Sequence, residues 1–248
     1  MSIKDIESAC SGYCHFCGKT HYLEQDRAKE YCLELMKTLE KQGRIDFDLP
    51  DQKADPRLSL DYIKGEAGGQ MFGVLECLDE NSRPVILKAF SGQYNGVWIV
   101  EGWVPPLLNV EKFDELVNNV DKQIKNLGKR IDGSDGFERK KLREERKKLS
   151  QGLMKEIHAL YRVRNFRSEL KSLPDFFEKG IPTGAGDCCA PKLLNAAAEQ
   201  KLTPKSLAEI YWGGTNRSCS RMQGTFYTAC AEKCQPILGF MLCGIRQQ

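Results

Sequence analysis

The chain has 248 residues, of which 41% are hydrophobic and 29% charged, and its formal net charge is +3. This composition supports one sizeable hydrophobic core and excludes an intrinsically disordered chain. No stretch approaches the ~20 apolar residues that a membrane span needs, and no secretory signal is visible. We therefore expect a soluble, cytoplasmic protein. In such a reducing compartment, the eleven cysteines favour metal ligands and buried thiols over disulfides.

The first cysteine group lies close to the N-terminus. Cys14 and Cys17 form a Cys-x2-Cys-Gly knuckle, which supplies two zinc ligands from one turn. His21 is the expected third ligand, and Cys32 or Cys10 is the fourth. We assign a structural zinc to Cys14, Cys17, His21 and Cys32. Because the Cys-x3-Cys-x2-Cys spacing also occurs at iron–sulfur sites, an iron–sulfur cluster and unmetallated thiols are the alternatives.

The next segments read as a helix followed by a strand pair. Apolar residues recur at helical spacing over residues 25–42, which predicts a helix that ends at Gly43. The same spacing places Cys32 on the buried face, where it can be a core residue instead of a ligand. Residues 71–78 and 84–90 then predict a β-hairpin with a five-residue loop, which residues 97–100 can extend.

Residues 110–171 change in character. Apolar residues at spacings of three and four over 113–131 and 142–160 predict an antiparallel helical hairpin. Its returning arm, residues 138–171, holds twelve Lys or Arg and five Glu, and arginines alternate with aromatic residues over 161–167. Aromatic side chains can stack on bases and arginines can hold phosphates. This pattern therefore favours an RNA-binding arm over a merely solvated surface. The candidate RNA-binding residues are Lys147, Lys148, Lys155, Arg162, Arg164, Arg167 and, beyond the arm, Lys192.

A second cysteine group comes from residues 186–194 and 229–236. Each part follows a turn-rich stretch and precedes an apolar run, which predicts two helix starts where N–H groups favour thiolates. Helices are expected over 192–200 and 236–243, and a short strand over 206–212. Cys188, Cys230 and Cys234 can hold a catalytic zinc with a fourth position left open. Cys230 and Cys234 are four residues apart and are expected to share one helix face. The other late cysteines, together with Cys77, are expected to be packed thiols: Cys189, Cys219 and Cys243.

Three thiolates and a nearby carboxylate match the needs of a nucleobase deaminase, in which zinc activates a water and a carboxylate carries the proton. The usual signature places Glu two residues after the first ligand and ends in Pro-Cys-x2-Cys. Here Ala190 or Pro191 stands at the Glu position, and the second pair is Cys-x3-Cys. We therefore assign proton transfer to Asp187, with Glu209 and Glu232 as alternatives. Asp187 could instead cap the following helix.

Five segments carry a resemblance to a known family. They are residues 68–75, 89–92, 182–194, 211–213 and 234–239. These segments are similar to the amino-terminal half of long, multidomain RNA pseudouridine synthases, a family that includes a bifunctional tRNA-editing enzyme. The resemblance implies a cytidine-deaminase-like module with metal positions at Cys188, Cys230 and Cys234, and a helical insert that grips tRNA. The Arg-Leu-Asp motif of the isomerase is not found in the sequence, so pseudouridine formation is not implied.

The sequence therefore predicts a three-layer α/β deaminase-like fold with a mixed sheet. Residues 1–45 form the zinc-knuckle extension and helix, residues 46–109 and 172–248 form the catalytic domain, and residues 110–171 form an inserted basic helical hairpin. The expected activity is zinc-dependent C-to-U deamination of structured RNA, with tRNA as the expected partner. One alternative is a non-catalytic, zinc-stabilised RNA-binding protein in which Cys189 closes the second site. Another is deamination of a free nucleoside or nucleotide.

Overall fold

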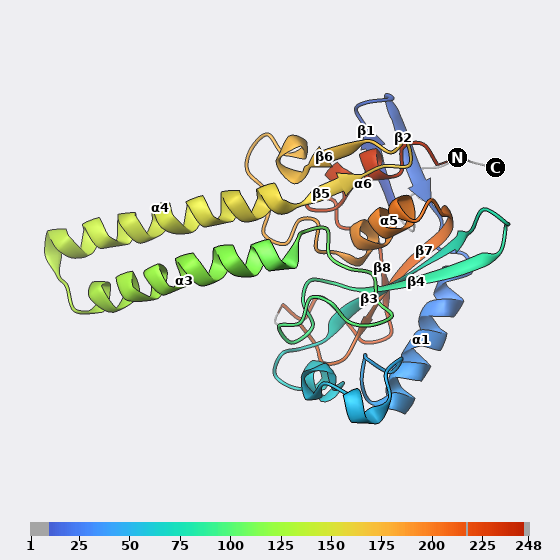
Figure 1. The fold of residues 1–248 in the computed structure, drawn as a ribbon, viewed down its shortest axis with the longest axis horizontal. Helices are drawn as coiled ribbons and strands as arrows, with labels where there is room; N and C mark the ends of the chain where they lie inside the picture. The colour runs from blue at the N-terminus through green and yellow to red at the C-terminus, as the bar shows by residue number, and fades with distance from the viewer. Residues whose placement is uncertain (1–9, 217, 246–248) are drawn as a thin grey trace.

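The computed structural model describes residues 10–216 and 218–245, and its core has three layers (Figure 1). The central layer is a four-stranded sheet in the order β4-β3-β7-β8. Helix α1 (Ala28–Gln42) covers one face of this sheet, and helix α5 (Cys189–Glu199) covers the other. The strands are β3 (Gln70–Leu78), β4 (Pro84–Phe90), β7 (Thr203–Trp212) and β8 (Phe226–Tyr227).

Two hydrophobic clusters lie between the layers, one on each face of the sheet, because alternate residues of a strand point to opposite faces. On β3, Phe72 and Val74 pack with α1, whereas Met71 and Leu75 pack with α5. All residues of β3 except its first and last are buried, as expected for a strand that has helices on both sides.

The sheet differs from the predicted mixed sheet. Its three pairings, β3 with β4, β3 with β7 and β7 with β8, are all antiparallel. The predicted hairpin of β3 and β4 is confirmed. The expected extension over 97–100 does not form a strand, and Val97 makes only an isolated bridge with Tyr94. The predicted short strand at 206–212 is the longer β7.

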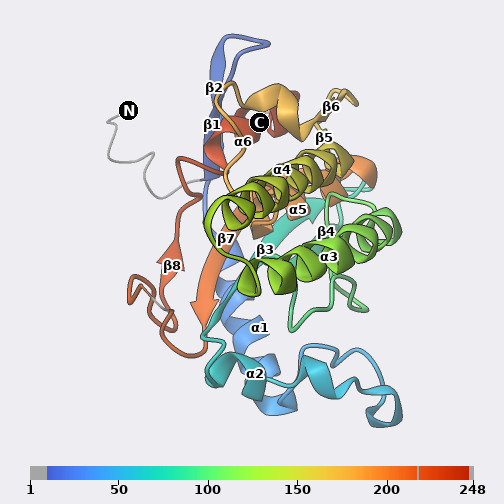
Figure 2. The same cartoon turned by 90° about the vertical axis from the view of Figure 1, so that its left-hand side faces the viewer.

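The predicted helical hairpin is confirmed as α3 (Val110–Asp132) and α4 (Gly136–Leu160). Figure 1 shows it projecting from the core, and Figure 2 shows it nearly end-on. Leu127, Ile131 and Leu142 hold its two helices together. The returning helix is shorter than expected, since the chain turns after Leu160 into a small antiparallel pair, β5 (Arg162–Arg164) and β6 (Leu170–Ser172). No helix in the described part of the chain is both long enough and apolar enough to cross a membrane.

A second small hairpin lies at the N-terminal side of the structure. Strands β1 (Cys10–Cys14) and β2 (Lys19–Leu23) pair antiparallel, and β1 packs on helix α6 (Gln235–Met241). Helix α6 also packs on α5. The remaining short elements are η2 (Asp51–Lys53), η3 (Pro56–Leu58), α2 (Asp61–Lys64) and η4 (Leu173–Phe176).

Candidate metal centres

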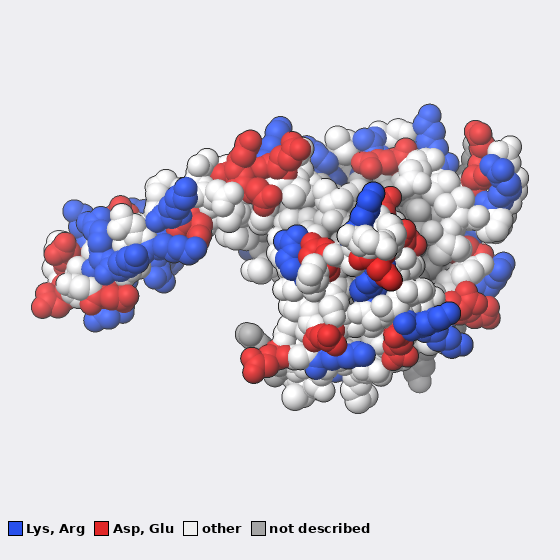
Figure 3. Space-filling view, turned by 60° about the horizontal axis from the view of Figure 1, so that its bottom comes forward, with Lys and Arg blue, Asp and Glu red and all other residues white. Residues whose placement is uncertain are grey.

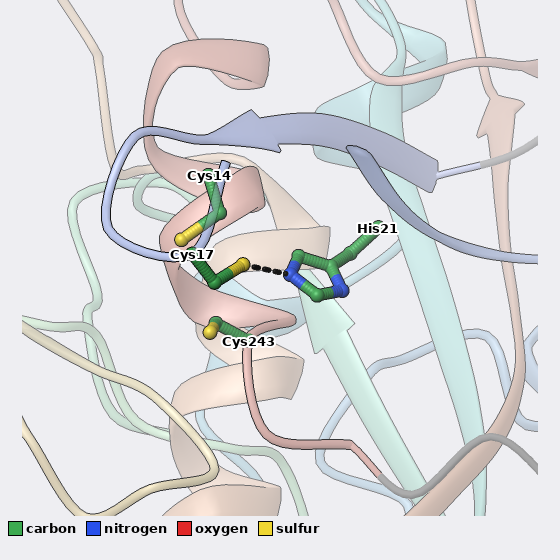
Figure 4. Close-up of side chains that lie close together, drawn as sticks. All are labelled: Cys14, Cys17, His21 and Cys243. Atoms are coloured by element: carbon green, nitrogen blue, oxygen red, sulfur yellow. Dashed lines mark hydrogen bonds between the residues drawn. The ribbon is translucent and has the colours of Figure 1, made fainter. Parts of the chain in front are cut away.

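The first centre joins the N-terminal hairpin to the end of α6. Cys14 ends β1, Cys17 lies in the following turn, His21 lies on β2 and Cys243 follows α6 (Figure 4). Their potential ligand atoms all lie within 4.8 Å of one another, and Cys17 Sγ is 3.0 Å from His21 Nε2. The N–H of Gly18 donates to the carbonyl of Cys14 at 2.9 Å and closes the knuckle turn. Three sulfurs and one imidazole are a donor set that could hold a structural zinc ion.

Cys243 occupies the place that the sequence assigns to Cys32, so that assignment is corrected. Cys32 lies on the buried face of α1, and its thiol donates to the carbonyl of Ala208 at 3.4 Å. Burial raises the pKa of Cys32 to about 12, and its sulfur is not among the ligand atoms that come together at the first centre. Cys10, the other candidate, is buried at the start of β1 and does not join the four ligands.

The sequence does contain a signal that could have found Cys243. Cys243 is followed by Gly244 just as Cys17 is followed by Gly18, and both glycines have positive φ, 98° and 68°. Each cysteine is therefore followed by a turn that L-residues adopt with difficulty. Arg167 lies beside this centre and hydrogen-bonds to Cys243. The backbone of Lys19 lowers the pKa of Cys17 most, and the neighbouring thiols and the charge of Arg167 lower it further.

The second centre brings together the three cysteines that the sequence predicts. The sulfurs of Cys188, Cys230 and Cys234 lie within 4.8 Å of one another. As predicted, Cys188 and Cys234 stand at helix starts, since they are the N-cap residues of α5 and α6. Contrary to the prediction that Cys230 and Cys234 share one helix face, Cys230 is not on a helix. It lies in a turn in which its carbonyl accepts the N–H of Cys234 at 3.1 Å.

The donor set of the second centre fits zinc. Tetrahedral zinc with bonds of ~2.3 Å separates two sulfurs by about 3.8 Å, and the sulfurs of Cys230 and Cys234 are 3.5 Å apart. Hydrogen bonds among the three thiols lower the pKa of Cys230 and raise those of Cys188 and Cys234. In the described part of the chain, no fourth Cys, His, Asp or Glu joins this group. Cys189 instead donates its thiol to the carbonyl of Met71 at 3.4 Å.

Two carboxyl groups lie near α5: Asp187 is half-buried and Glu209 is buried. Asp187 Oδ1 accepts a hydrogen bond of 2.6 Å from the hydroxyl of Tyr161, and burial raises the pKa of Asp187. Asp187 does not cap α5, because Cys188 occupies the cap position. Glu209, on β7, accepts the N–H of Ala190 at 2.8 Å.

Burial raises the pKa of Glu209 to about 7. Its hydrogen bond with the N–H of Ala190, two residues after Cys188, places the carboxyl group of Glu209 beside the start of α5. Glu232, the third carboxyl weighed as a proton carrier, is exposed. The sequence offers no motif that singles out Glu209, because the strand brings it to the site from outside both cysteine segments.

The predicted RNA-binding residues differ in how exposed their side chains are. Lys147, Lys148 and Lys155 are exposed on α4, and Figure 3 shows Lys and Arg gathered on the hairpin with acidic residues among them. Arg162 is exposed but donates to the carbonyl of Ala159 at 2.7 Å. Arg164 is half-buried, 4.0 Å from Glu199.

Lys192 belongs to the core, so its assignment as an RNA contact is corrected. Its side chain is 1% exposed and donates to the carbonyls of Phe90 at 2.9 Å and Gly92 at 2.7 Å. Burial lowers the pKa of Lys192 to about 8. The helical spacing of α5 places this residue on the face that packs against the sheet.

Comparisons of the chain with protein-family models, with curated proteins and with solved structures found no match. The two centres differ in their number of donors. The first has the four donors of a structural zinc site, and the second has three donors, the number found in catalytic zinc sites.

Proposed function

We propose that the chain is a zinc-dependent cytidine deaminase acting on structured RNA, with tRNA as the expected substrate. The observation that carries the proposal is the second centre, where three thiols converge and the fourth candidate, Cys189, points to a backbone carbonyl. A zinc ion held by three protein ligands keeps one position for an activated water. A closed site with four protein ligands would instead favour the non-catalytic RNA-binding protein.

The fold supports this proposal through its helix starts and not through its sheet. A deaminase-like module presents its ligands at the beginnings of two helices, and α5 and α6 begin at Cys188 and Cys234. The antiparallel sheet differs from the mixed sheet expected of such a module. The metal donors and the resemblance of residues 182–194 therefore support the assignment more strongly than the topology does.

The proposed reaction adds water at C4 of cytosine and releases ammonia, so a carboxyl group must carry a proton to the departing amine. Asp187 is the first candidate because it adjoins Cys188 in the chain. Its hydrogen bond with Tyr161 fixes the carboxyl, and its burial favours the protonated form that can donate. Glu209 is the second candidate, reaching the same region from β7.

The projecting hairpin supports an RNA substrate over a free nucleoside. Helix α4 carries eight Lys or Arg and four Glu, and its residues Lys147, Lys148 and Lys155 are exposed. Such a charged arm can hold the backbone of a folded RNA, whereas a nucleoside could not reach both the arm and the second centre. Unpaired loop bases are the preferred targets because they cost least to extrude.

The decisive experiment incubates the zinc-loaded protein with total tRNA from its own source and with unmodified tRNA transcripts. C-to-U changes are scored by reverse-transcription sequencing, with Cys230→Ala as the inactive control. New uridines that the control lacks would support deamination and identify the position. Salt-sensitive tRNA binding with two bound zinc ions and no new uridine in either substrate pool would support the RNA-binding protein instead.

A further inference from the structure

A cavity of about 710 Å³ lies between the N-terminal hairpin, η4 and α6. This volume falls within the ~300–1,000 Å³ of typical small-ligand sites. Cys14 of the first centre lines it at one side. Ala231 and Gln235 also line it, and they directly follow Cys230 and Cys234 in the chain. The cavity therefore extends from the first metal centre to the segment that carries the second.

The walls of this cavity are aromatic and partly open to solvent. Tyr13 and Phe16 are 50% and 59% exposed, although large aromatic side chains are usually buried. Phe176 and Phe240 line the cavity from η4 and α6. Aromatic faces that remain accessible in a cavity can stack on flat ligands, and base stacking is a common use of such faces.

Cations accompany these aromatic rings. The ammonium of Lys171 is 5.1 Å from the ring centroid of Phe240 and 5.9 Å from that of Phe176. The guanidinium of Arg167 is 5.9 Å from the ring centroid of Phe16. A flat ligand that enters the cavity therefore meets positive charge at Lys171, beside Phe176 and Phe240, and Arg167 adds a positive charge beside Phe16. A nucleotide with its phosphate would require such charges.

Two carboxylates provide hydrogen-bond acceptors in the same wall. Asp175 Oδ2 accepts the N–H of Ser172 at 2.9 Å, which fixes this carboxylate, and Glu178 is exposed. Carboxylates accept hydrogen bonds from exocyclic amines of bases. Cytosine, adenine and guanine carry such amines and uracil does not.

We infer that this cavity binds an unpaired, amine-bearing nucleobase of single-stranded RNA. The base stacks on Tyr13 and Phe16, its amine faces Glu178, and its phosphates face Lys171 and Arg167. The choice of RNA rests on the proposed function, to which the inference adds a second nucleotide site. A base held here lies next to the segment of the second centre, so the cavity selects the nucleotide that neighbours the target.

Binding of fluorescein-labelled hexacytidylate and hexauridylate, measured by fluorescence anisotropy, tests this inference. Stacking is worth roughly 1–3 kcal/mol per base, so Phe16→Ala and Tyr13→Ala should each weaken hexacytidylate binding by about five-fold or more. Hexauridylate should bind more weakly than hexacytidylate, and Glu178→Gln should narrow that difference. Ile99→Ala, which truncates a side chain that is 61% exposed elsewhere, is the matched control. Unchanged binding in both aromatic variants, or an equal loss in the control, would overturn the inference.

Photo-cross-linking locates the bound base and separates this inference from the proposed function. Hexacytidylate that carries 5-iodocytidine should cross-link to a peptide containing Tyr13 or Phe16, and cross-links confined to α4 would refute the assignment. If the wild type makes no uridine but these cross-links form, only the proposed function fails. If it makes uridine and Phe16→Ala binds and cross-links like the wild type, only the cavity assignment fails. Zinc content shows that each variant is folded.

Discussion

Gly12 of β1 and Gly239 of α6 lie backbone against backbone. A Cβ atom on Gly12 would overlap the amide nitrogen and Cα of Gly239, and one on Gly239 would overlap the carbonyl of Tyr13. This contact sets the N-terminal hairpin, which carries three ligands of the first centre, directly on α6. Cys234 is the N-cap residue of α6 and Cys243 follows its end, so one ligand of each centre flanks the same helix.

Gly239→Ala should therefore lower the free energy of unfolding by about 1–3 kcal/mol, because backbone atoms cannot move aside as a flexible side chain can. Urea denaturation measures this loss, and the zinc content of the first centre should fall with it. Gly152→Ala is the control. Gly152 lies in α4 with nothing within 4 Å of an added Cβ, and alanine there should be neutral or stabilising by up to ~1 kcal/mol. A Gly239→Ala protein as stable as the wild type would contradict the close contact.

The assignment of Cys243, in place of Cys32, as the fourth ligand of the first centre can be tested by zinc analysis. Cys243→Ala should reduce the zinc content from two ions per chain to about one, because it removes a donor of the first centre. Cys32→Ala should keep both ions and only destabilise the core, since Cys32 packs between α1 and the sheet. Cys219→Ser, at an exposed cysteine, is the control. Zinc loss in Cys32→Ala with full zinc in Cys243→Ala would restore the sequence-based assignment.

The correction from Cys32 to Cys243 shows why the sequence could predict only part of the first centre. Cys14, Cys17 and His21 belong to one hairpin, so their spacing alone fixes their proximity. Cys243 reaches them through tertiary packing of α6 on β1, which no local spacing encodes. The second centre is easier to predict because each of its cysteine segments marks a helix start. The order of the strands in the sheet has no such local signal.

The same distinction explains the errors at Lys192 and in the sheet. Charge alone suggested that Lys192 meets RNA, whereas its position among the apolar residues of α5 places it in the core. Strand positions followed from the hairpin pattern of residues 71–78 and 84–90, since β3 and β4 lie there. Strand direction depends on how the long hairpin insertion returns the chain to β7, and periodicity does not determine that.

The buried Lys192 should give a distinctive pH dependence of stability. Its pKa falls from the ordinary 10.5 to about 8 in the fold, so between these values the unfolded chain binds more protons than the folded one. Stability from this group therefore rises with pH across this window, and the penalty is constant below it. Relative to Lys192→Met, wild-type unfolding free energy should increase from pH 8 to 10.5, on the order of 3 kcal/mol.

Urea denaturation at several pH values gives this difference, and other titrating groups largely cancel between the two proteins. Lys37→Met, at an exposed position, controls for the loss of one positive charge. A constant difference between the wild type and Lys192→Met across the window would show that the ammonium carries no burial penalty.

Charge reversal on the hairpin should weaken tRNA binding and reduce its salt dependence. Replacing Lys147, Lys148 and Lys155 by Glu removes up to three phosphate contacts, each of which contributes about 0.7–0.9 to the slope of log affinity against log salt. The slope should therefore shrink by about two. Filter binding from 50 to 200 mM salt measures it. The matched control reverses three exposed lysines outside the hairpin: Lys37, Lys41 and Lys53. Equal losses in both triple variants would show only a general charge effect.

Asp187→Asn and Glu209→Gln distinguish the two candidate proton carriers. If Asp187 carries the proton, Asp187→Asn should lower kcat by about 10²–10⁴-fold with two zinc ions retained, and Glu209→Gln should remain active. Tyr161→Phe, which removes the 2.6 Å hydrogen bond to Asp187, should have a smaller effect that changes the pH profile. Single-turnover deamination of the target RNA gives these rates. The opposite pattern, with activity lost only in Glu209→Gln, would transfer the role to the strand residue and leave Asp187 as a half-buried partner of Tyr161.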